Sequence, residues 1–256
     1  MTDAFEVTGD FSSADSLSHD SSHSGDAFVV GNSAEPTEVM QDVAPAAPNG
    51  FQKLGLRPEL LQAVQDLGFT EPTSVQIKTI PLALPTDSKA GEAKRFIDLM
   101  VSSQTGSGKT AAFLLPVLHT LLMQEEEAQA KERADFEQAV ADAAAKGEAP
   151  PKRPKRKDPT SSRNFKAAEP GALILCPTRE LAQQVAHDAI DLVRHCRGLR
   201  VANVVGGMPY QLQIAKLQNA NLVVATPGRL LDLQRSMQIK LDKVQFLVVD
   251  EADRML

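Results

Sequence analysis

The sequence predicts an α/β fold in which a parallel sheet is flanked by helices. Short apolar runs alternate along the chain with amphipathic stretches of helical spacing. Continuous apolar runs are typical of strands covered on both faces, and repeated strand–helix units form parallel sheets with right-handed connections. The expected strands are IDLMV at 97–101, ALILC at 172–176, VANVV at 201–205, LVVAT at 222–226 and FLVVD at 246–250.

The expected helices precede and separate these strands. In ELLQAVQDLGF, the apolar residues Leu60, Val64 and Leu67 recur on one helical face, and Gly68 is a helix stop signal. Further stretches show the same amphipathic pattern, and they lie at 110–122, 180–196, 210–218 and 228–236.

Two segments depart from this alternation. Residues 1–50 hold nine acidic residues and no Lys or Arg, and without a sustained period they are expected to form a disordered acidic tail. Residues 124–169 are interpreted as an insertion that leaves the core, with a Glu- and Ala-rich helix at 124–149 followed by a flexible basic arm, PPKRPKRKDP at 150–159. The basic arm is either a solvated linker or a segment that contacts nucleic-acid phosphates, with nuclear localisation as a further interpretation.

Composition narrows the class of protein. The chain has 33 acidic residues, and removing the nine in the tail leaves 24 against 27 Lys and Arg, so the body is mildly basic and compatible with nucleic-acid binding. Cys176 and Cys196 form no CxxC pair, which argues against a zinc site and against a structural disulfide. No basic-then-apolar start resembles a signal peptide, and no apolar stretch is long enough to span a membrane. We therefore predict a soluble cytoplasmic protein.

A phosphate-binding loop is predicted within VSSQTGSGKTAAF at 101–113, between an apolar run and an amphipathic helix. Glycines let the backbone N–H groups approach phosphate oxygens, and the start of the helix adds its positive end. Lys109 would reach the β- and γ-phosphates, and the Thr110 hydroxyl would ligate Mg²⁺. Ser103 stands where such loops usually carry glycine, and an ordinary Gly-Ser turn is the alternative. The residues expected to bind the nucleotide here are Thr105, Gly106, Ser107, Gly108, Lys109 and Thr110.

The acids of FLVVDEADRML at 246–256 supply the second half of a nucleotide-hydrolysing site. Asp250 follows an apolar strand and would hold the Mg²⁺, while Glu251 would orient or deprotonate the attacking water. Parallel strands bring Lys109 and Asp250 to the same carboxyl edge of the sheet. An acidic surface loop is the alternative for this segment alone.

From about Phe51 to Leu256 the chain resembles the first RecA-like domain of a DEAD-box RNA helicase. Six motifs occur in the order of that family: GFTEPTSVQ at 68–76, SQTGSGKT at 103–110, PTREL at 177–181, Gly206-Gly207, TPGR at 226–229 and DEAD at 250–253. The resemblance implies a RecA-like P-loop domain that binds ATP and Mg²⁺.

The resemblance also implies an adenine site. Gln76 carries both a donor and an acceptor, which suits the adenine edge. Phe51 resembles the family's aromatic that stacks on adenine, with a simple core position as the alternative. Thr73 and the helix after it would support the phosphate loop.

PTREL, the glycine pair and TPGR would contact an RNA backbone, as the resemblance implies. The motifs PTREL and TPGR each follow an apolar run and start a helix, whose N–H groups suit phosphate. For Arg179 and Arg229 the alternative is a structural salt bridge. One Tyr and no Trp leave no rich stacking platform, so we expect little sequence preference. The expected RNA-binding residues are Pro177, Thr178, Arg179, Gly206, Gly207, Thr226, Pro227, Gly228 and Arg229.

The resemblance implies an ATP-dependent RNA helicase in which a second RecA-like domain completes the ATP site. Asp253 would couple the ATP site to that machinery. No such second domain is found in residues 1–256, so the chain is interpreted as a fragment that hydrolyses ATP negligibly on its own. The alternatives are a DNA-directed helicase or translocase and a non-enzymatic adaptor that binds RNA or protein.

Overall fold

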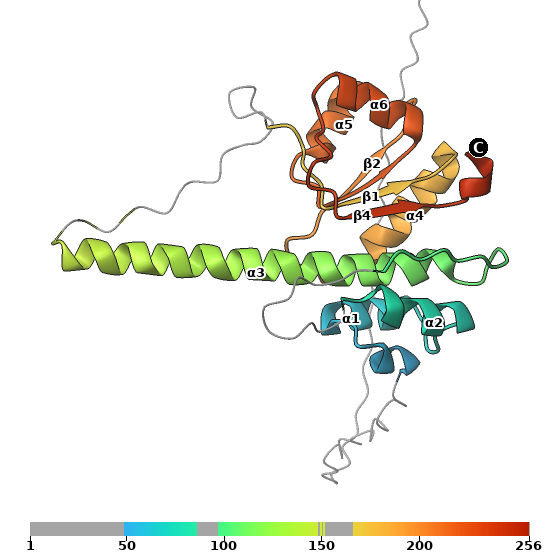
Figure 1. Ribbon diagram of the computed structural model, residues 1–256, viewed down its shortest axis with the longest axis horizontal. Coiled ribbons are helices and arrows are strands. Elements are labelled where there is room, and N and C mark those ends of the chain that lie inside the picture. The colour runs from blue at the N-terminus through green and yellow to red at the C-terminus, as the bar shows by residue number, and fades with distance from the viewer. Residues whose placement is uncertain (1–48, 86–96, 148, 150, 152–165, 256) are drawn as a thin grey trace, which may run out of the picture. The chain divides into compact units, whose positions relative to one another are not determined.

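The computed structural model describes residues 49–85, 97–147, 149, 151 and 166–255 (Figure 1). The acidic tail predicted at 1–50 lies outside the described residues except for its last two positions, and the basic arm predicted at 150–159 lies outside them except for Pro151. The described elements are the 3₁₀ helix η1 (Gly50–Leu54), α1 (Pro58–Asp66), α2 (Ser74–Ala83), α3 (Lys109–Ala145), β1 (Ala172–Leu175), α4 (Arg179–Leu192), β2 (Val201–Val204), α5 (Tyr210–Leu217), β3 (Leu222–Ala225), α6 (Pro227–Arg235), β4 (Phe246–Val249) and the 3₁₀ helix η3 (Ala252–Arg254).

The four strands form one parallel sheet in the order β2-β3-β1-β4. Ala172 of β1 lies opposite Leu222 of β3 on one side and Phe246 of β4 on the other. The predicted α/β class with a parallel sheet flanked by helices is therefore confirmed. Because all strands run the same way, the loops that follow them leave from one edge of the sheet.

The central strands β1 and β3 are covered on both faces. Alternate residues of a strand point to opposite faces, and Ile174 accordingly belongs to the core cluster that includes α3 and α4, whereas Leu173 belongs to the cluster that includes α5 and α6. Figure 1 shows α3 between the sheet and the helices α1 and α2. A hydrogen bond between Asp66 Oδ2 and His195 Nε2, at 2.6 Å, further joins α1 to the segment after α4. The two central strands are therefore buried between two helical layers, which explains their continuous apolar runs.

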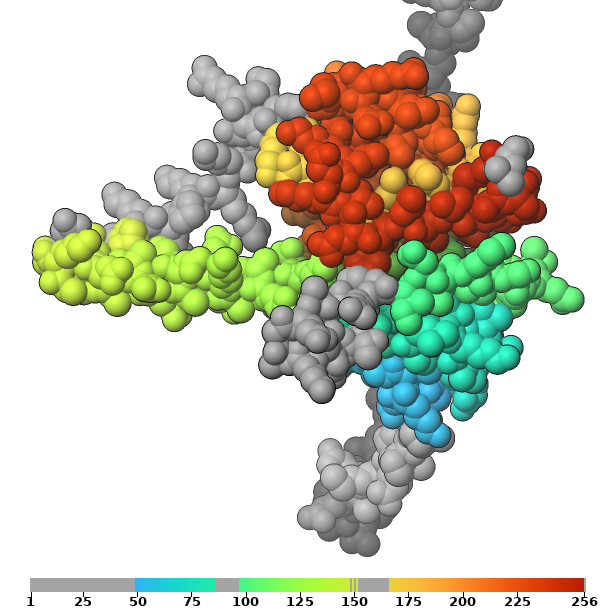
Figure 2. Space-filling view, in the orientation of Figure 1, coloured from blue at the N-terminus to red at the C-terminus, as the bar shows by residue number. Residues whose placement is uncertain are grey.

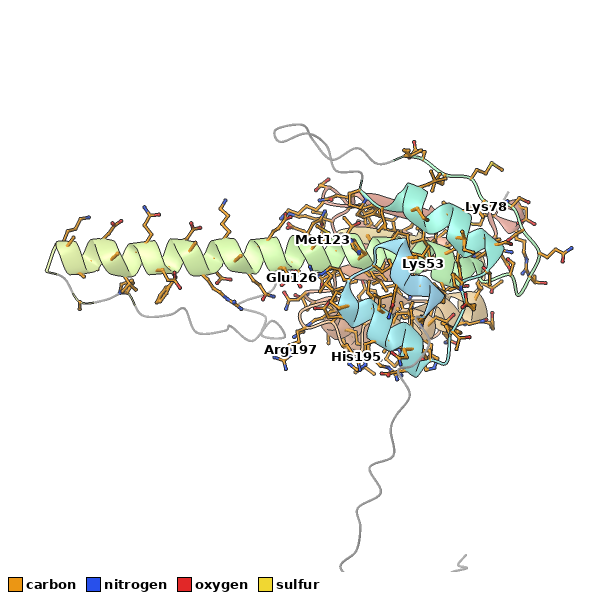
Figure 3. The ribbon with its side chains drawn as sticks, turned by 90° about the horizontal axis from the view of Figure 1, so that it is seen from below. Lys53, Lys78, Met123, Glu126, His195 and Arg197 are labelled. Carbon is orange, nitrogen blue, oxygen red and sulfur yellow. The ribbon has the colours of Figure 1, made fainter. Side chains whose placement is uncertain are left out.

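Helix α3 is a single helix of 37 residues. The sequence predicted a core helix at 110–122 and a charged helix at 124–149, and the structure joins the two without a break. The helix is buried from Leu114 to Leu122, whereas most of its side chains beyond Gln124 are exposed. Figure 3 shows it continuing past Met123 and Glu126, away from the other helices. We call residues 124–145 the helical arm.

The prediction of a strand at 97–101 is wrong. These residues have no strand structure, and their side chains are exposed, including Ile97 at 56% and Met100 at 99%. A strand needs a hydrogen-bonded neighbour, and none of the described residues pairs with this segment. Strand β4 is correspondingly an edge strand, with Leu247 exposed by 61% and Val249 by 44%. In Figure 2 the chain around β4, in red, lies at the surface.

Within the described ranges, no helix is both long and apolar enough to cross a bilayer. Cys176 and Cys196 are both buried with free thiols.

Candidate functional site

Four of the predicted motifs lie at the carboxyl edge of the sheet. Residues 176–179 follow β1, residues 205–208 follow β2, Thr226 follows β3 and Asp250 follows β4. The backbone links neighbouring loops, since the N–H of Asp250 donates to the carbonyl oxygen of Leu175 at 2.9 Å. Four segments that are distant in sequence therefore form one surface.

The phosphate loop closes around the ammonium group of Lys109, the first residue of α3. Its Nζ donates to the carbonyl oxygens of Ser103 at 2.5 Å and Gln104 at 2.8 Å. The hydroxyls of Ser103 and Ser107 are hydrogen-bonded at 2.6 Å. Ser103, the residue that departs from the usual glycine, thus contributes both a carbonyl and a hydroxyl to the closed loop. The loop places a positive charge next to the N-terminus of α3, where a phosphate is favoured.

Two glycines give the loop its shape. Gly106 has φ +77° and Gly108 has φ +82°, in the left-handed region that residues with a Cβ rarely adopt. Gly108 is also the N-cap of α3, and a Cβ there would come within 2.5 Å of the Gln76 amide nitrogen. Thr110 follows as the second residue of the helix, with a partly exposed side chain.

Gln76 connects α2 to this loop. Its Nε2 donates to the Gly108 carbonyl oxygen at 3.1 Å, and its Oε1 accepts from the Thr73 N–H at 2.9 Å. The Thr73 hydroxyl in turn accepts from the Gln76 N–H, which completes a capping box. The side chain is 5% exposed. No other partner of this amide is found among the described residues, which leaves one N–H and one lone pair.

Phe51 belongs to the core. Phe51 is 1% exposed and belongs to the buried apolar cluster that also contains residues of α1, α3 and α4. No face of the ring is open for stacking on a base, so the structure supports the core interpretation of this residue over the adenine-stacking one.

The acids lie at the end of β4. The Glu251 N–H donates to Asp250 Oδ1 at 3.0 Å, and Arg254 Nη1 donates to Glu251 Oε2 at 2.7 Å. Burial is the main influence that raises the pKa of Asp250, and the charge of Glu251 raises it further. The backbone hydrogen bond from Glu251 and the charge of Lys109 lower that pKa, so the ammonium acts on this carboxylate through space. Asp253 is exposed in η3.

The Asp250 side chain suits a divalent cation. A half-buried carboxylate whose pKa is raised by burial is stabilised in its charged form when a cation binds beside it. Among the described residues no three His, Cys, Asp or Glu side chains form a metal-binding group. Mg²⁺ bound with a nucleotide needs no such cluster, because phosphate and water oxygens supply most of its ligands. Asp250 and Thr110 are the side chains that would complete this set.

The second group of motifs surrounds the glycine pair. Thr178 caps α4, since its hydroxyl accepts from the Leu181 N–H at 3.2 Å, and Arg179 follows it. A Cβ at Gly206 would lie 3.4 Å from the Arg179 guanidinium, and one at Gly207 would lie 2.7 Å from it. The guanidinium therefore packs directly on the glycines. Pro177 lies between β1 and this cap.

Arg229, at the start of α6, approaches the same turn. Its Nε donates to the Val205 carbonyl oxygen and its Nη2 to the Met208 carbonyl oxygen, both at 3.4 Å. Among the described residues neither Arg179 nor Arg229 forms an ion pair with a carboxylate, so the salt-bridge alternative is not what the structure shows.

The N-terminus of α6 lies beside this arginine. Thr226 is the N-cap and makes no side-chain capping bond, Pro227 is the first helical residue, and a Cβ at Gly228 would meet open space. These segments form one polar surface, which we call the turn surface. It consists of Arg179, Gly206, Gly207, Thr226, Pro227, Gly228 and Arg229.

Sequence reasoning missed two residues beside the turn surface. Gln213 of α5 is 1% exposed and donates from Nε2 to the Val205 carbonyl oxygen. Tyr210 places its ring 5.7 Å from the Arg229 guanidinium carbon. The burial of Gln213 could have been predicted, because it stands four residues before Leu217 and so lies on the apolar face of its helix.

Comparisons with known proteins agree with the motif order. A family profile described as DEAD/DEAH box helicase matches residues 73–256. The chain is 39% identical over 222 residues to "DEAD-box ATP-dependent RNA helicase 52A" of Oryza sativa subsp. japonica, covering 86% of this chain and 31% of that protein. It is 35% identical over 208 residues to "ATP-dependent RNA helicase RhlB" of Pseudomonas syringae pv. tomato, covering 80% of this chain and 41% of that protein. The chain thus spans about a third to two-fifths of the length of these relatives.

Two solved structures share the fold. The RNA helicase Prp28 from Chaetomium thermophilum bound to ADP matches with a TM-score of 0.55 and 32% identity, over 82% of this chain and 40% of that one. Dbp5 from S. cerevisiae bound to RNA and ADP BeF3 matches with a TM-score of 0.53 and 29% identity, over 81% of this chain and 39% of that one.

Proposed function

The chain belongs to the DEAD/DEAH box helicase family, and from this membership we propose that it is the ATP-binding part of an ATP-dependent RNA helicase. Residues 51–256 would be the first RecA-like domain, with 124–169 as its insertion. A second RecA-like domain would complete the ATP site, and in the assembled enzyme ATP hydrolysis would drive the unwinding of short RNA duplexes or the remodelling of RNA–protein complexes. The free buried thiols fit a reducing cytoplasm.

The observation that carries the proposal is the electrostatic influence of Lys109 on Asp250. The charge of Lys109 lowers the pKa of Asp250, although the two residues belong to elements far apart in sequence. A phosphate chain with its Mg²⁺ would bind between them, with the phosphates next to the Lys109 ammonium and the Mg²⁺ next to the Asp250 carboxylate.

Each residue has a defined task in this proposal. Lys109 leaves the carbonyl oxygens of its own loop to bind the β- and γ-phosphates, Thr110 and Asp250 hold Mg²⁺, and Glu251 orients the attacking water. The bound Mg²⁺ would neutralise charge that develops on the phosphates. Gln76 would bind adenine through its free N–H and lone pair while it holds the phosphate loop through Gly108. Asp253 would couple this site to the second domain.

The turn surface is the proposed RNA site. Arg179, Arg229 and the N-termini of α4 and α6 offer cationic groups and backbone N–H groups, and these suit phosphates rather than base edges. The similar protein Dbp5 was solved with RNA and ADP BeF3 bound together, which supports an RNA site in this family. Binding through phosphates predicts little sequence preference.

The test is titration of Mg-ATP into the 256-residue chain and its Lys109→Ala variant by calorimetry. We expect weak binding to the wild-type chain, loss of binding in the variant, and negligible hydrolysis by either. Lys131→Ala, which removes an exposed lysine on the helical arm, is the matched control and should bind as the wild type does. Equal binding by Lys109→Ala and the wild type would reject the site.

Hydrolysis is tested in a longer protein that includes the second domain. RNA should stimulate its ATPase activity more than DNA of the same sequence does, and Lys109→Ala should abolish this stimulation. Equal stimulation by DNA would favour a DNA-directed enzyme.

A further inference from the structure

A buried glutamine holds the turn that follows β2. Gln213 is 1% exposed, and its Nε2 donates to the Val205 carbonyl oxygen. Its Oε1 is buried and has no hydrogen-bond partner within the described part of the chain. An unpaired buried oxygen opposes folding, and a methionine of similar length would fill the position without that cost. The glutamine is therefore better explained by its N–H donor, whose partner is the turn.

Arg229 binds the same turn from a second direction. Its two hydrogen bonds reach the carbonyl oxygens of Val205 and Met208, which lie on either side of the Gly206–Gly207 pair. The guanidinium thus spans the glycines. Since arginine has five N–H donors, three remain for an anion.

Tyr210 supports this guanidinium from the neighbouring helix. The ring centroid lies 5.7 Å from the Arg229 guanidinium carbon, within the range of a cation–π contact. Its hydroxyl is hydrogen-bonded to the Ser236 hydroxyl, which also donates to the Asp232 carbonyl oxygen at 2.8 Å. The tyrosine ring is therefore anchored to the end of α6, the helix that begins with Arg229.

We propose that Gln213 and Tyr210 are positioning residues, which fix the glycine turn and the Arg229 guanidinium in the arrangement that binds phosphates of single-stranded RNA. The proposal rests on the RNA-binding function proposed above and deepens it by two residues. Gln213 is too buried to touch a ligand, so it acts through the turn. Because the Arg179 guanidinium packs on Gly206 and Gly207, a shift of the turn displaces both arginines.

The first experiment compares the 256-residue chain with Gln213→Met. Fluorescence anisotropy with a labelled oligouridylate gives the affinity at several salt concentrations, and circular dichroism gives the thermal unfolding midpoint. We expect about tenfold weaker RNA binding, the effect of weakening one charge-assisted hydrogen bond. The slope of log affinity against log salt should fall in magnitude by about 0.7, the share of one phosphate on a single strand. The unfolding midpoint should stay the same or rise, since an unpaired buried oxygen is removed.

Gln218→Met is the matched control. Gln218 is a buried glutamine at the end of the same helix, is 5% exposed and also has an unpaired amide atom among the described residues, but it makes no bond to the turn. Its variant should bind RNA with the wild-type affinity and salt slope. A purely structural effect of Gln→Met would weaken both variants alike.

Substitutions of Tyr210 test the second residue. Tyr210→Leu removes the ring and should weaken RNA binding about as much as Gln213→Met does, whereas Tyr210→Phe keeps the ring and should retain most of the affinity. Wild-type affinity and salt slope in Gln213→Met would overturn the inference and leave the proposed function intact. If the wild-type chain itself shows no salt-dependent RNA binding, the proposed RNA-binding function is wrong and this inference falls with it.

Discussion

Gln76 donates a hydrogen bond from Nε2 to the backbone oxygen of Gly108, at 3.1 Å, and so joins the capping box of α2 to the first turn of α3. A Cβ on Gly108 would occupy the space of that amide nitrogen. The side chain proposed to bind adenine and the loop proposed to bind phosphate are thus one packed unit. A ligand bound to the Gln76 side chain should therefore affect how well the phosphate loop is ordered, and a ligand bound to the loop should affect Gln76.

The glycines of the phosphate loop should differ in their tolerance of a side chain. Both Gly106 and Gly108 have positive φ, so alanine at either costs about 1 kcal/mol of strain. Gly108→Ala must also displace Gln76, which adds the loss of a hydrogen bond and brings the total to about 2 kcal/mol. Gly106→Ala meets nothing within 4 Å and is the matched control. Urea unfolding without nucleotide measures both, and equal losses would contradict the packing of Gln76 on Gly108.

The stability effect of Asp250 should depend on pH. Because burial raises its folded-state pKa, the ionised group opposes folding at neutral pH. This cost declines as pH falls below the raised value and is gone below the ordinary pKa of the carboxyl group. Asp250→Asn should therefore increase the free energy of unfolding at pH 7 in the absence of Mg²⁺, with a smaller gain at lower pH. Urea unfolding at several pH values measures the difference.

Asp253→Asn, at an exposed position of the same motif, is the control for the loss of one carboxylate. A gain for Asp250→Asn that grows as pH falls would refute the effect of burial.

Both thiols should resist alkylation in the folded chain. Burial, with the charges of Asp250 and Glu251, raises the pKa of Cys176 to about 12, and burial raises that of Cys196 to about 11, from 9.0. Compared with a thiol of pKa 9.0, the thiolate fraction at pH 8 is therefore lower by about a thousandfold for Cys176 and by about a hundredfold for Cys196. The thiolate is the form that reacts with iodoacetamide. Mass spectrometry after iodoacetamide treatment should find labelling slowed by at least these factors relative to the urea-unfolded chain. Rapid labelling of either thiol in the native chain would show that its region opens.

The edge of β4 that has no strand partner among the described residues should promote self-association. An unpaired strand edge with exposed apolar side chains, here Leu247 and Val249, is a template for pairing with another chain. We expect light scattering to show concentration-dependent oligomers of the 256-residue chain, and Leu247→Lys should reduce them. Leu231→Lys replaces a leucine that is 46% exposed on α6 and should have less effect. Monomers at every concentration would argue that this edge is covered.

The sequence predicted the buried part of the sheet best. The runs at β1 and β3 are apolar at every position because both faces of these central strands are covered, and the pattern of such strands needs no further context. The loops that carry Arg179, Arg229 and Asp250 followed from β1, β3 and β4, since parallel strands end at one edge. The loop that carries Lys109 was expected after a strand at 97–101, which the structure does not contain.

Strand pairing, core packing and contacts between loops were not predictable, because each depends on residues distant in sequence. The run at 97–101 has the composition of a strand, but a strand also requires a partner, and composition does not report one. The burial of Phe51 depends on how η1 packs beneath the sheet, and its sequence context fitted two interpretations equally. The contact of Arg179 with the glycine pair joins loops of different strands and has no local signal.

Helix α3 begins at Lys109 and runs without interruption to Ala145, which at the rise of an α-helix is about 55 Å. A tilt of one degree at the phosphate loop would therefore carry the outer end by about 1 Å. A partner bound at the tip of the helical arm would therefore hold the same helix whose first residue is Lys109.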